Sequence, residues 1–221
     1  MKLSYLTTFC LSFVLLCLVN AQQENTISVS ENHFEGKIHF KKMAGSVEMK
    51  YNYFVKGDQI RIEELNELNE VVGIQLVNTK NKKLIAISPE RKLYLEAPSR
   101  RSGADLDVKV VKTERKKIIN GIECSEIIVI NKAQDRKIRY WVTAGNYSFF
   151  KPLLQVLNRK EKQALYFLKI RAIENCWPMK SVEFVISTGK VVSKLITLSI
   201  DNSEQNEVLF EIPEDYIKFE N

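Results

Sequence analysis

The sequence predicts a mainly β, α+β domain: a curved antiparallel sheet, or an incomplete barrel, with a helical lid. Two observations support this. Most of the chain after His33 consists of short segments that alternate apolar and polar residues between polar turns, as half-buried strands do. Residues 149–168 instead place apolar residues at helical spacing. A helix with such an apolar stripe must be covered, and the sheet is the one surface large enough to cover it.

The first strand shows the alternation clearly. Phe34, Ile38 and Phe40 form its apolar face, and His33 and His39 lie on the opposite, polar face. At about 3.3 Å per residue the two histidines are about 20 Å apart, so they cannot chelate one ion. We therefore expect both histidines to face solvent.

The remaining strands are expected between residues that favour turns. They cover residues 47–55, 60–63, 71–77, 83–87, 92–96, 106–119, 122–131, 136–142, 182–186 and 191–200. Gly57-Asp58 and Asn120-Gly121 are the tightest hairpin turns, because glycine accepts the positive φ that such turns demand. The connections are too short for crossovers, so the pairing should be antiparallel.

The helical segment carries its own start and stop signals. Its apolar stripe has members at i, i+3, i+4 and i+7, namely Phe150, Leu153, Leu154 and Leu157. Ser148 is placed to cap the first turn, and Pro152 is tolerated only near a helix start. Residues 158–162 are polar at every position. This polar patch can split the segment into two helices.

The N-terminus predicts export. Lys2 precedes an apolar run from Leu6 to Val19, and Val19 and Ala21 are the small residues expected before a signal-peptidase cut. The run is shorter than the about 20 residues that a membrane span needs. We expect residues 1–21 to be a cleaved signal peptide and residues 22–221 a single domain, in the periplasm or outside the cell. Lipidation at Cys17 is the alternative, which the flanking apolar residues disfavour.

Removal of residues 1–21 leaves two of the four cysteines, Cys124 and Cys176. In an oxidising compartment an even cysteine count predicts one disulfide between them. Two buried, unpaired thiols are the alternative. No metal site is expected, because the two cysteines and two histidines show no ligand spacing.

The net charge of +6 is concentrated in a few places. The basic residues that cluster are Arg100, Arg101, Lys112, Arg115, Lys116 and Lys117. No stacking aromatic residues lie among them, so a nucleic-acid partner is not expected. A solvated strand face is one interpretation, and contact with an anionic membrane surface or glycan is the other.

No motif predicts catalysis. The sequence has no Gly-x-Ser-x-Gly elbow, no His-Glu-x-x-His and no phosphate-binding glycine loop. Glu63 and Glu64 point to opposite faces of one strand, so they are not a paired acid and base. We expect neither an enzyme nor a cofactor.

Four stretches carry a family resemblance: residues 51–63, 88–94, 119–124 and 210–216. They resemble an uncharacterised family of exported bacterial envelope proteins, which is similar to the LolA-like lipoprotein carriers. The resemblance implies an incomplete antiparallel barrel, closed by a helical lid over an apolar cavity. No local motif places the ligand-binding arginine of those carriers in this chain.

Two hypotheses for function follow. In the first, the sheet and helix enclose a cavity that carries a lipid, an acyl chain or a lipidated protein. The residues expected to line it are Tyr51, Tyr53, Phe149, Phe150, Leu153, Leu154 and Leu157. In the second, the interior is filled by its own side chains, and the protein is a non-enzymatic interaction module of the cell envelope.

Overall fold

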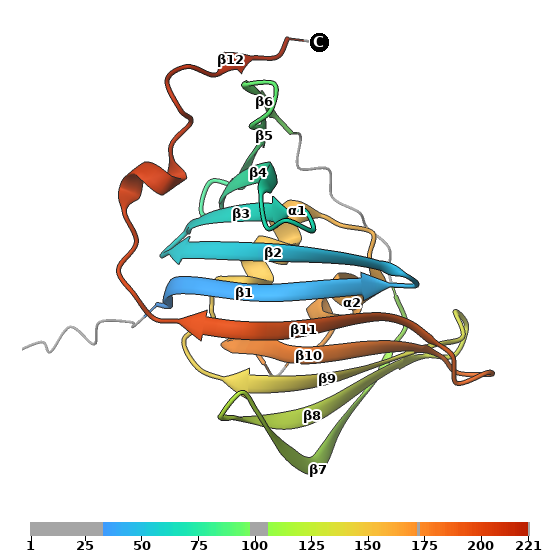
Figure 1. Ribbon diagram of the computed structural model, residues 1–221. Helices are drawn as coiled ribbons and strands as arrows, with labels where there is room; N and C mark the ends of the chain where they lie inside the picture. The colour runs from blue at the N-terminus through green and yellow to red at the C-terminus, as the bar shows by residue number, and fades with distance from the viewer. Residues whose placement is uncertain (1–32, 98–105, 172, 221) are drawn as a thin grey trace, which may run out of the picture. The chain divides into compact units, whose positions relative to one another are not determined.

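A computed structural model describes residues 33–97, 106–171 and 173–220 (Figure 1). The first half of its sheet contains β1 (Glu35–Ala44), β2 (Val47–Lys56), β3 (Gln59–Leu65), β4 (Val71–Asn78), β5 (Lys83–Ser88) and β6 (Leu93–Glu96). The second half contains β7 (Lys109–Ile119), β8 (Ile122–Asn131), β9 (Arg136–Ala144), β10 (Cys176–Val185), β11 (Val191–Asp201) and β12 (Ile217–Lys218). The predicted signal peptide, Cys17, Arg100 and Arg101 lie outside the described residues.

All these strands belong to one curved sheet that does not close. Its order is β12-β6-β5-β4-β3-β2-β1-β11-β10-β9-β8-β7, with β12 and β7 at the two edges. β1 joins the two halves, since Phe40 pairs with Tyr51 of β2 on one side and with Thr197 of β11 on the other. The mainly β fold with a curved, incomplete barrel is therefore confirmed.

The expected antiparallel meander is confirmed, with one addition. The pairings from β6 through β1 and β11 to β7 are all antiparallel. β12 adds to β6 in parallel, with Ile217 opposite Leu93. Parallel neighbours need a long connection, and the chain between β6 and β12 contains all of β7–β11 and both helices. At the β7–β8 hairpin, Asn120 and Gly121 both take positive φ, as this turn demands.

The predicted helical segment forms two helices, α1 (Phe150–Leu157) and α2 (Lys162–Leu168). The polar residues 158–161 separate them, so the predicted split is confirmed. Figure 1 shows both helices on the inner side of the curve, behind β1–β3 and β11 in this view. The expected cap was wrong: Phe149 begins α1 without a side-chain cap, and Ser148 Oγ lies 3.1 Å from His33 Nδ1.

The last strand pair begins earlier than predicted. We expected this strand over residues 182–186, but β10 also includes Trp177 and Pro178 and lies in the interior of the sheet. A proline cannot donate a ladder hydrogen bond and is accommodated at bulges. The register of β10 against β9 shifts between Pro178 and Lys180, which provides such a bulge.

The structure corrects the predicted disulfide, because Cys124 and Cys176 are both free thiols. Ser125, next to Cys124, pairs with Val142 of β9, and Cys176 pairs with Ala144 on the other side of β9. One strand therefore separates the cysteines, and two strand spacings amount to about 10 Å. A disulfide requires Cα atoms within about 7 Å of each other.

The interior holds one large apolar cluster, formed by the helices and the strands from β1 to β4 and from β8 to β11. A smaller cluster of Ile74, Leu76 and Ile87 is covered by Ile212 and Tyr216 of the C-terminal segment. The 3₁₀ helix η1 (Glu207–Phe210) of that segment is tied to β3, since Arg61 Nη1 donates to the Leu209 carbonyl at 3.1 Å. Residues 210–216, one of the four family-like stretches, thus serve packing.

Candidate functional site

The predicted ligand-binding residues all gather in the large interior cluster. Tyr51, Tyr53, Phe149, Phe150, Leu153 and Leu154 are buried in it, and Leu157 is partly buried against it. Tyr53, Phe150 and Leu154 also line a pocket between the sheet and the helices, whereas the other four pack around it. The sequence prediction therefore identifies the cluster and part of the pocket lining.

The centre of this cluster is Trp177, which the sequence analysis placed outside the site. Its side chain is fully buried, and Nε1 donates to Thr197 Oγ1 at 2.8 Å. Five aromatic rings have centroids between 4.5 and 6.3 Å from its own, namely those of Phe40, Tyr53, Tyr147, Phe149 and Phe150. The alternation of Trp177, Met179 and Ser181 could have revealed a strand here, but Pro178 indicated a strand boundary.

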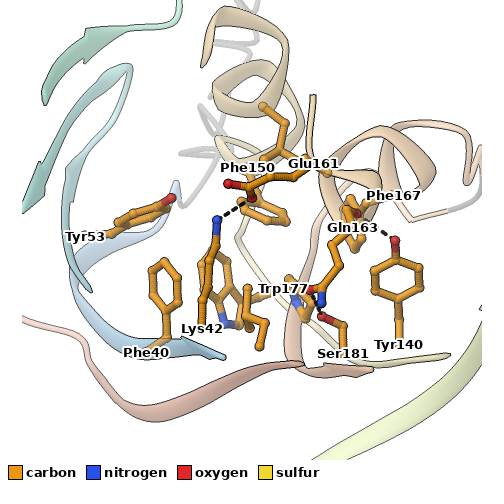
Figure 2. Close-up of a pocket in the computed structure, with 14 residues that line it drawn as sticks. Phe40, Lys42, Tyr53, Tyr140, Phe150, Glu161, Gln163, Phe167, Trp177 and Ser181 are labelled. Carbon is orange, nitrogen blue, oxygen red and sulfur yellow. Dashed lines mark hydrogen bonds and ion pairs between the residues drawn. The ribbon is translucent and has the colours of Figure 1, made fainter. Parts of the chain in front are cut away.

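The pocket lies where this aromatic cluster meets α2 (Figure 2). Its apolar lining is Phe40, Tyr53, Tyr140, Phe150, Leu154, Ala164, Phe167, Trp177, Pro178 and Leu195. Its volume is about 40 Å³. A water molecule occupies about 30 Å³ in the liquid, and an engineered cavity of about 150 Å³ accepts benzene. An acyl chain can therefore enter only if the helical segment moves outward.

One polar side of the pocket connects α2 to the sheet through partly buried hydrogen bonds. Gln163 Nε2 donates to Ser193 Oγ at 2.7 Å, and Ser181 Oγ donates to Gln163 Oε1 at 2.5 Å. Ser193 Oγ in turn donates to Glu183 Oε2 at 2.8 Å. Tyr140 Oη donates to the Gln163 carbonyl at 2.7 Å. We call Gln163, Ser181, Ser193 and Glu183 the amide network; it fixes the start of α2.

The other polar side connects the α1–α2 linker, residues 158–161, to the sheet through charges. Lys42 Nζ of β1 lies 2.7 Å from Glu161 Oε2, and Figure 2 shows this ion pair among the residues that line the pocket. Arg159 Nη1 lies 3.8 Å from Glu161 Oε1, and Arg159 Nη2 donates to Gln75 Oε1 at 3.2 Å. We call Lys42 and Glu161, which line the pocket, together with Arg159, which lies beside them but does not line it, the charged rim.

Burial divides the charged rim unevenly. The Lys42 side chain is 19% exposed and that of Arg159 21%, against 48% for Glu161. Burial, and then the positive charge of Arg159, lower the pKa of Lys42, although Glu161 acts to raise it. Burial acts to raise the pKa of Glu161, but the charges of Lys42 and Arg159 together lower it. The rim thus keeps two partly desolvated cations beside one accessible carboxylate.

Tyr53 shows how dry the adjoining wall is. Its side chain is 4% exposed, and burial raises its pKa to about 12. Such a wall holds hydrocarbon well and an unpaired charge poorly. The cationic rim is therefore the place on this pocket where a charged ligand group can be held.

The pocket combines an apolar lining with four polar side chains, those of Lys42, Glu161, Gln163 and Ser181. No histidine or cysteine lines the pocket. Among the described residues, no group of three or more His, Cys, Asp or Glu side chains could hold a metal ion, and no helix is long and apolar enough to cross a bilayer. An apolar pocket with a few convergent polar groups is the usual form of a small-molecule site.

Residues 34–216 match the sequence profile of a protein family described as a domain of unknown function, DUF4412. The chain belongs to this family. The profile covers all four stretches that carried the family resemblance. No curated protein matches the sequence.

Several solved structures are similar to this chain. An uncharacterised conserved protein from Thermus thermophilus is 11% identical with a TM-score of 0.53, over 86% of this chain and 91% of that one. MucB, in the MucA/MucB complex of Pseudomonas aeruginosa, is 9% identical with a TM-score of 0.48, over 85% of this chain and 58% of that one. A LolA superfamily protein from Nitrosomonas europaea is 10% identical with a TM-score of 0.35, over 82% and 91%. At such identities the likeness concerns the fold alone.

Proposed function

We propose that this protein is exported and binds a hydrophobic ligand, which is a lipid, an acyl chain or the lipid part of a lipoprotein, between its sheet and its two helices. Residues 1–21 are its cleaved signal peptide. The ligand contacts the predicted residues Tyr51, Tyr53, Phe149, Phe150, Leu153, Leu154 and Leu157, together with Trp177. The protein is a non-enzymatic binder or carrier of the cell envelope.

The observation that carries this proposal is the mixed lining of the pocket. Ten of its lining residues are apolar or aromatic, yet Lys42, Glu161, Gln163 and Ser181 also reach it. A core that serves stability alone gains nothing from a partly buried lysine, because well-packed apolar residues are equally or more stabilising there. A binding pocket, in contrast, uses a few polar groups to orient its ligand.

The small volume of the pocket sets a condition on this function. The helical segment must move away from β1 and β10 before a chain can enter, so the structure corresponds to a closed state in this proposal. The linker side is the side that yields, because its ion pairs depend on Glu161, which is about half exposed, and pairs with an exposed partner contribute only about 0.2 to 1 kcal/mol each. The resemblance to carriers with a helical lid agrees with this movement.

The test is retention and uptake of an acyl ligand. Protein purified from its native compartment is examined by native mass spectrometry with organic extraction, and delipidated protein is titrated with a fluorescent fatty acid. We expect a co-purified lipid and saturable uptake. Ala164→Leu, which fills the pocket, should abolish uptake, and Ala133→Leu on an exposed turn should not. If neither lipid nor uptake is found, the interior is a filled core and the interaction module is the better account.

A second proposal concerns the surface of β7. Lys112, Arg115, Lys116 and Lys117 are all exposed on this edge strand, and we infer that they contact an anionic membrane surface. Lysines on an edge strand also discourage pairing with another chain, which is their alternative role. Co-sedimentation with anionic and neutral vesicles at low and high salt separates the two. Binding to anionic vesicles alone, weakened by salt, supports the membrane contact.

A further inference from the structure

The charged rim also restricts which hydrophobic ligands fit. We propose that the pocket takes an anionic amphiphile, an acyl chain that ends in a carboxylate or a phosphate, with the head group held by Lys42 and Arg159. This inference rests on the proposed function, because it assigns the head-group end of the same site.

The first argument is charge balance. Lys42 and Arg159 together carry two positive charges, and among the described residues Glu161 is the carboxylate that forms an ion pair with either of them. The other partners of Arg159 are neutral, namely the amide oxygen of Gln75 and the side chain of Tyr51. Burial, and then the charge of Arg159, lower the pKa of Lys42, and they outweigh the opposite effects of Glu161 and Glu64. A second anion at this place relieves their mutual repulsion.

The second argument is position. Lys42 and Phe40 are alternate residues of β1 and both line the pocket, so the Lys42 side chain lies beside the apolar lining. The dry wall at Tyr53 and Trp177 is suited to the chain. Figure 2 shows Lys42 extending past these rings toward Glu161. The pocket therefore offers an apolar wall to the acyl chain of the amphiphile and a cationic group to its anionic head group.

The third argument is that Glu161 can give up its place. Its side chain is 48% exposed and lies on the linker rather than on the sheet. Rotating the Glu161 side chain out into the solvent costs little free energy, because its carboxylate is already partly hydrated. The ligand head group then accepts the charge-assisted hydrogen bonds that Glu161 now accepts. In this account Glu161 occupies the anion site of the empty pocket.

The experiment compares ligands that share one chain. Delipidated protein loaded with a neutral fluorescent acyl probe is challenged with hexadecanoate, hexadecyl phosphate or neutral monohexadecanoylglycerol, and displacement constants are measured. We expect the anionic ligands to displace the probe about tenfold more tightly than the neutral one, the order of one charge-assisted hydrogen bond. The two anionic arms show whether a carboxylate or a phosphate is preferred. The preference should fall as salt rises.

Two variants test the residues independently. Lys42→Met and Arg159→Gln should each lower the ratio of anionic to neutral affinity to about threefold or less. Lys41→Met, whose side chain pairs with Glu48, and Lys160→Met, which is exposed on the linker, are the matched controls and should keep the wild-type ratio. Thermal melts of each variant establish that it is folded.

The outcomes are distinguishable. Equal displacement by the anionic and neutral ligands overturns the head-group assignment but leaves the proposed function intact. A preference that survives in both Lys42→Met and Arg159→Gln also overturns the assignment. If the wild-type protein takes up neither the probe nor any competitor, both the proposed function and the head-group assignment fail.

Discussion

The helices are joined to the sheet on two sides of one pocket, and the two sides are built differently. On the α2 side the amide network is partly buried, with Ser181 and Glu183 buried, and the neighbouring Phe167 of α2 is 1% exposed. On the linker side the charged rim ends in Glu161, which is about half exposed. A buried polar group that loses its hydrogen-bond partner destabilises the fold, because water cannot replace the partner. A half-exposed charged group can be hydrated instead, so losing its partner costs less free energy. The comparison leads to the prediction that the α2 side stays fixed and the linker side moves when the proposed ligand enters.

The largest effect should come from the packing on the α2 side. Phe167→Ala removes a ring that contacts those of Tyr140 and Phe150, so we expect the free energy of unfolding to fall by about 3 to 5 kcal/mol. Urea melts measure it. Phe219→Ala, at a ring that is 49% exposed, is the control and should change stability by no more than about 0.5 kcal/mol. A loss below about 1 kcal/mol at Phe167 would show that α2 is not anchored.

The next effect concerns the amide network. Gln163→Ala leaves Ser181 Oγ and Ser193 Oγ without their Gln163 partners, and we expect a loss of about 1 to 3 kcal/mol in unfolding free energy. Gln155→Ala, at an exposed position of α1, is the matched control. If Gln163→Ala and Gln155→Ala have the same free energy of unfolding, the amide network does not hold the α2 side more firmly than the linker side.

A smaller effect of opposite sign is expected at Lys42. Burial lowers its pKa, so the charged lysine destabilises the folded state below that pKa, and the penalty disappears as the pH rises toward the unfolded value of 10.5. The substitution Lys42→Met should therefore raise the free energy of unfolding by up to about 1 kcal/mol at neutral pH. The difference between wild type and variant should shrink in alkaline melts. A variant that is less stable at neutral pH would show that the lysine serves stability rather than binding.

The smallest effect should come from Glu161. The pKa of this group is lowered by Lys42 and Arg159 against the effect of burial, so its contribution is present above the unfolded value of 4.5 and is lost as the pH falls through the folded pKa. Because the side chain is half exposed, Glu161→Gln should cost less than about 1 kcal/mol at neutral pH. Melts between pH 7 and pH 3 measure it, with Glu48→Gln as the exposed control. If Glu161→Gln lowers the free energy of unfolding by more than about 2 kcal/mol, the linker side is held as firmly as the α2 side.

Much of the fold could be predicted because it depends on local pattern. Alternation identified most strands, Asn120-Gly121 identified the β7–β8 hairpin, and the polar residues 158–161 identified the break between the helices. The β12 strand was missed because it is two residues long and depends on pairing with a distant edge. The start of β10 was missed because Pro178 usually ends a strand, and only the sheet provides the bulge that accommodates it.

The site was predictable in its apolar half only. Phe150 and Leu154 follow from helical spacing, and Tyr53 follows from strand alternation. The charged rim depends on contacts between residues far apart in the sequence, since Lys42 meets Glu161 across 119 positions. The disulfide prediction failed for a related reason. Cysteine count gives no information on strand order, and β9 lies between Cys124 and Cys176.

The central claim is that an acyl chain enters the pocket beside Trp177, and quenching of tryptophan fluorescence tests this claim most directly. The chain has two tryptophans, and Trp177 lines the pocket whereas Trp141 does not. In Trp141→Phe protein, titration with a fatty acid brominated along its chain should quench the remaining Trp177 emission saturably, and the unbrominated acid should not. Trp177→Phe protein, which keeps Trp141, reports quenching from outside the pocket. If the brominated acid leaves Trp177 emission unchanged, or quenches Trp141 equally, no chain occupies this interior and the account is contradicted.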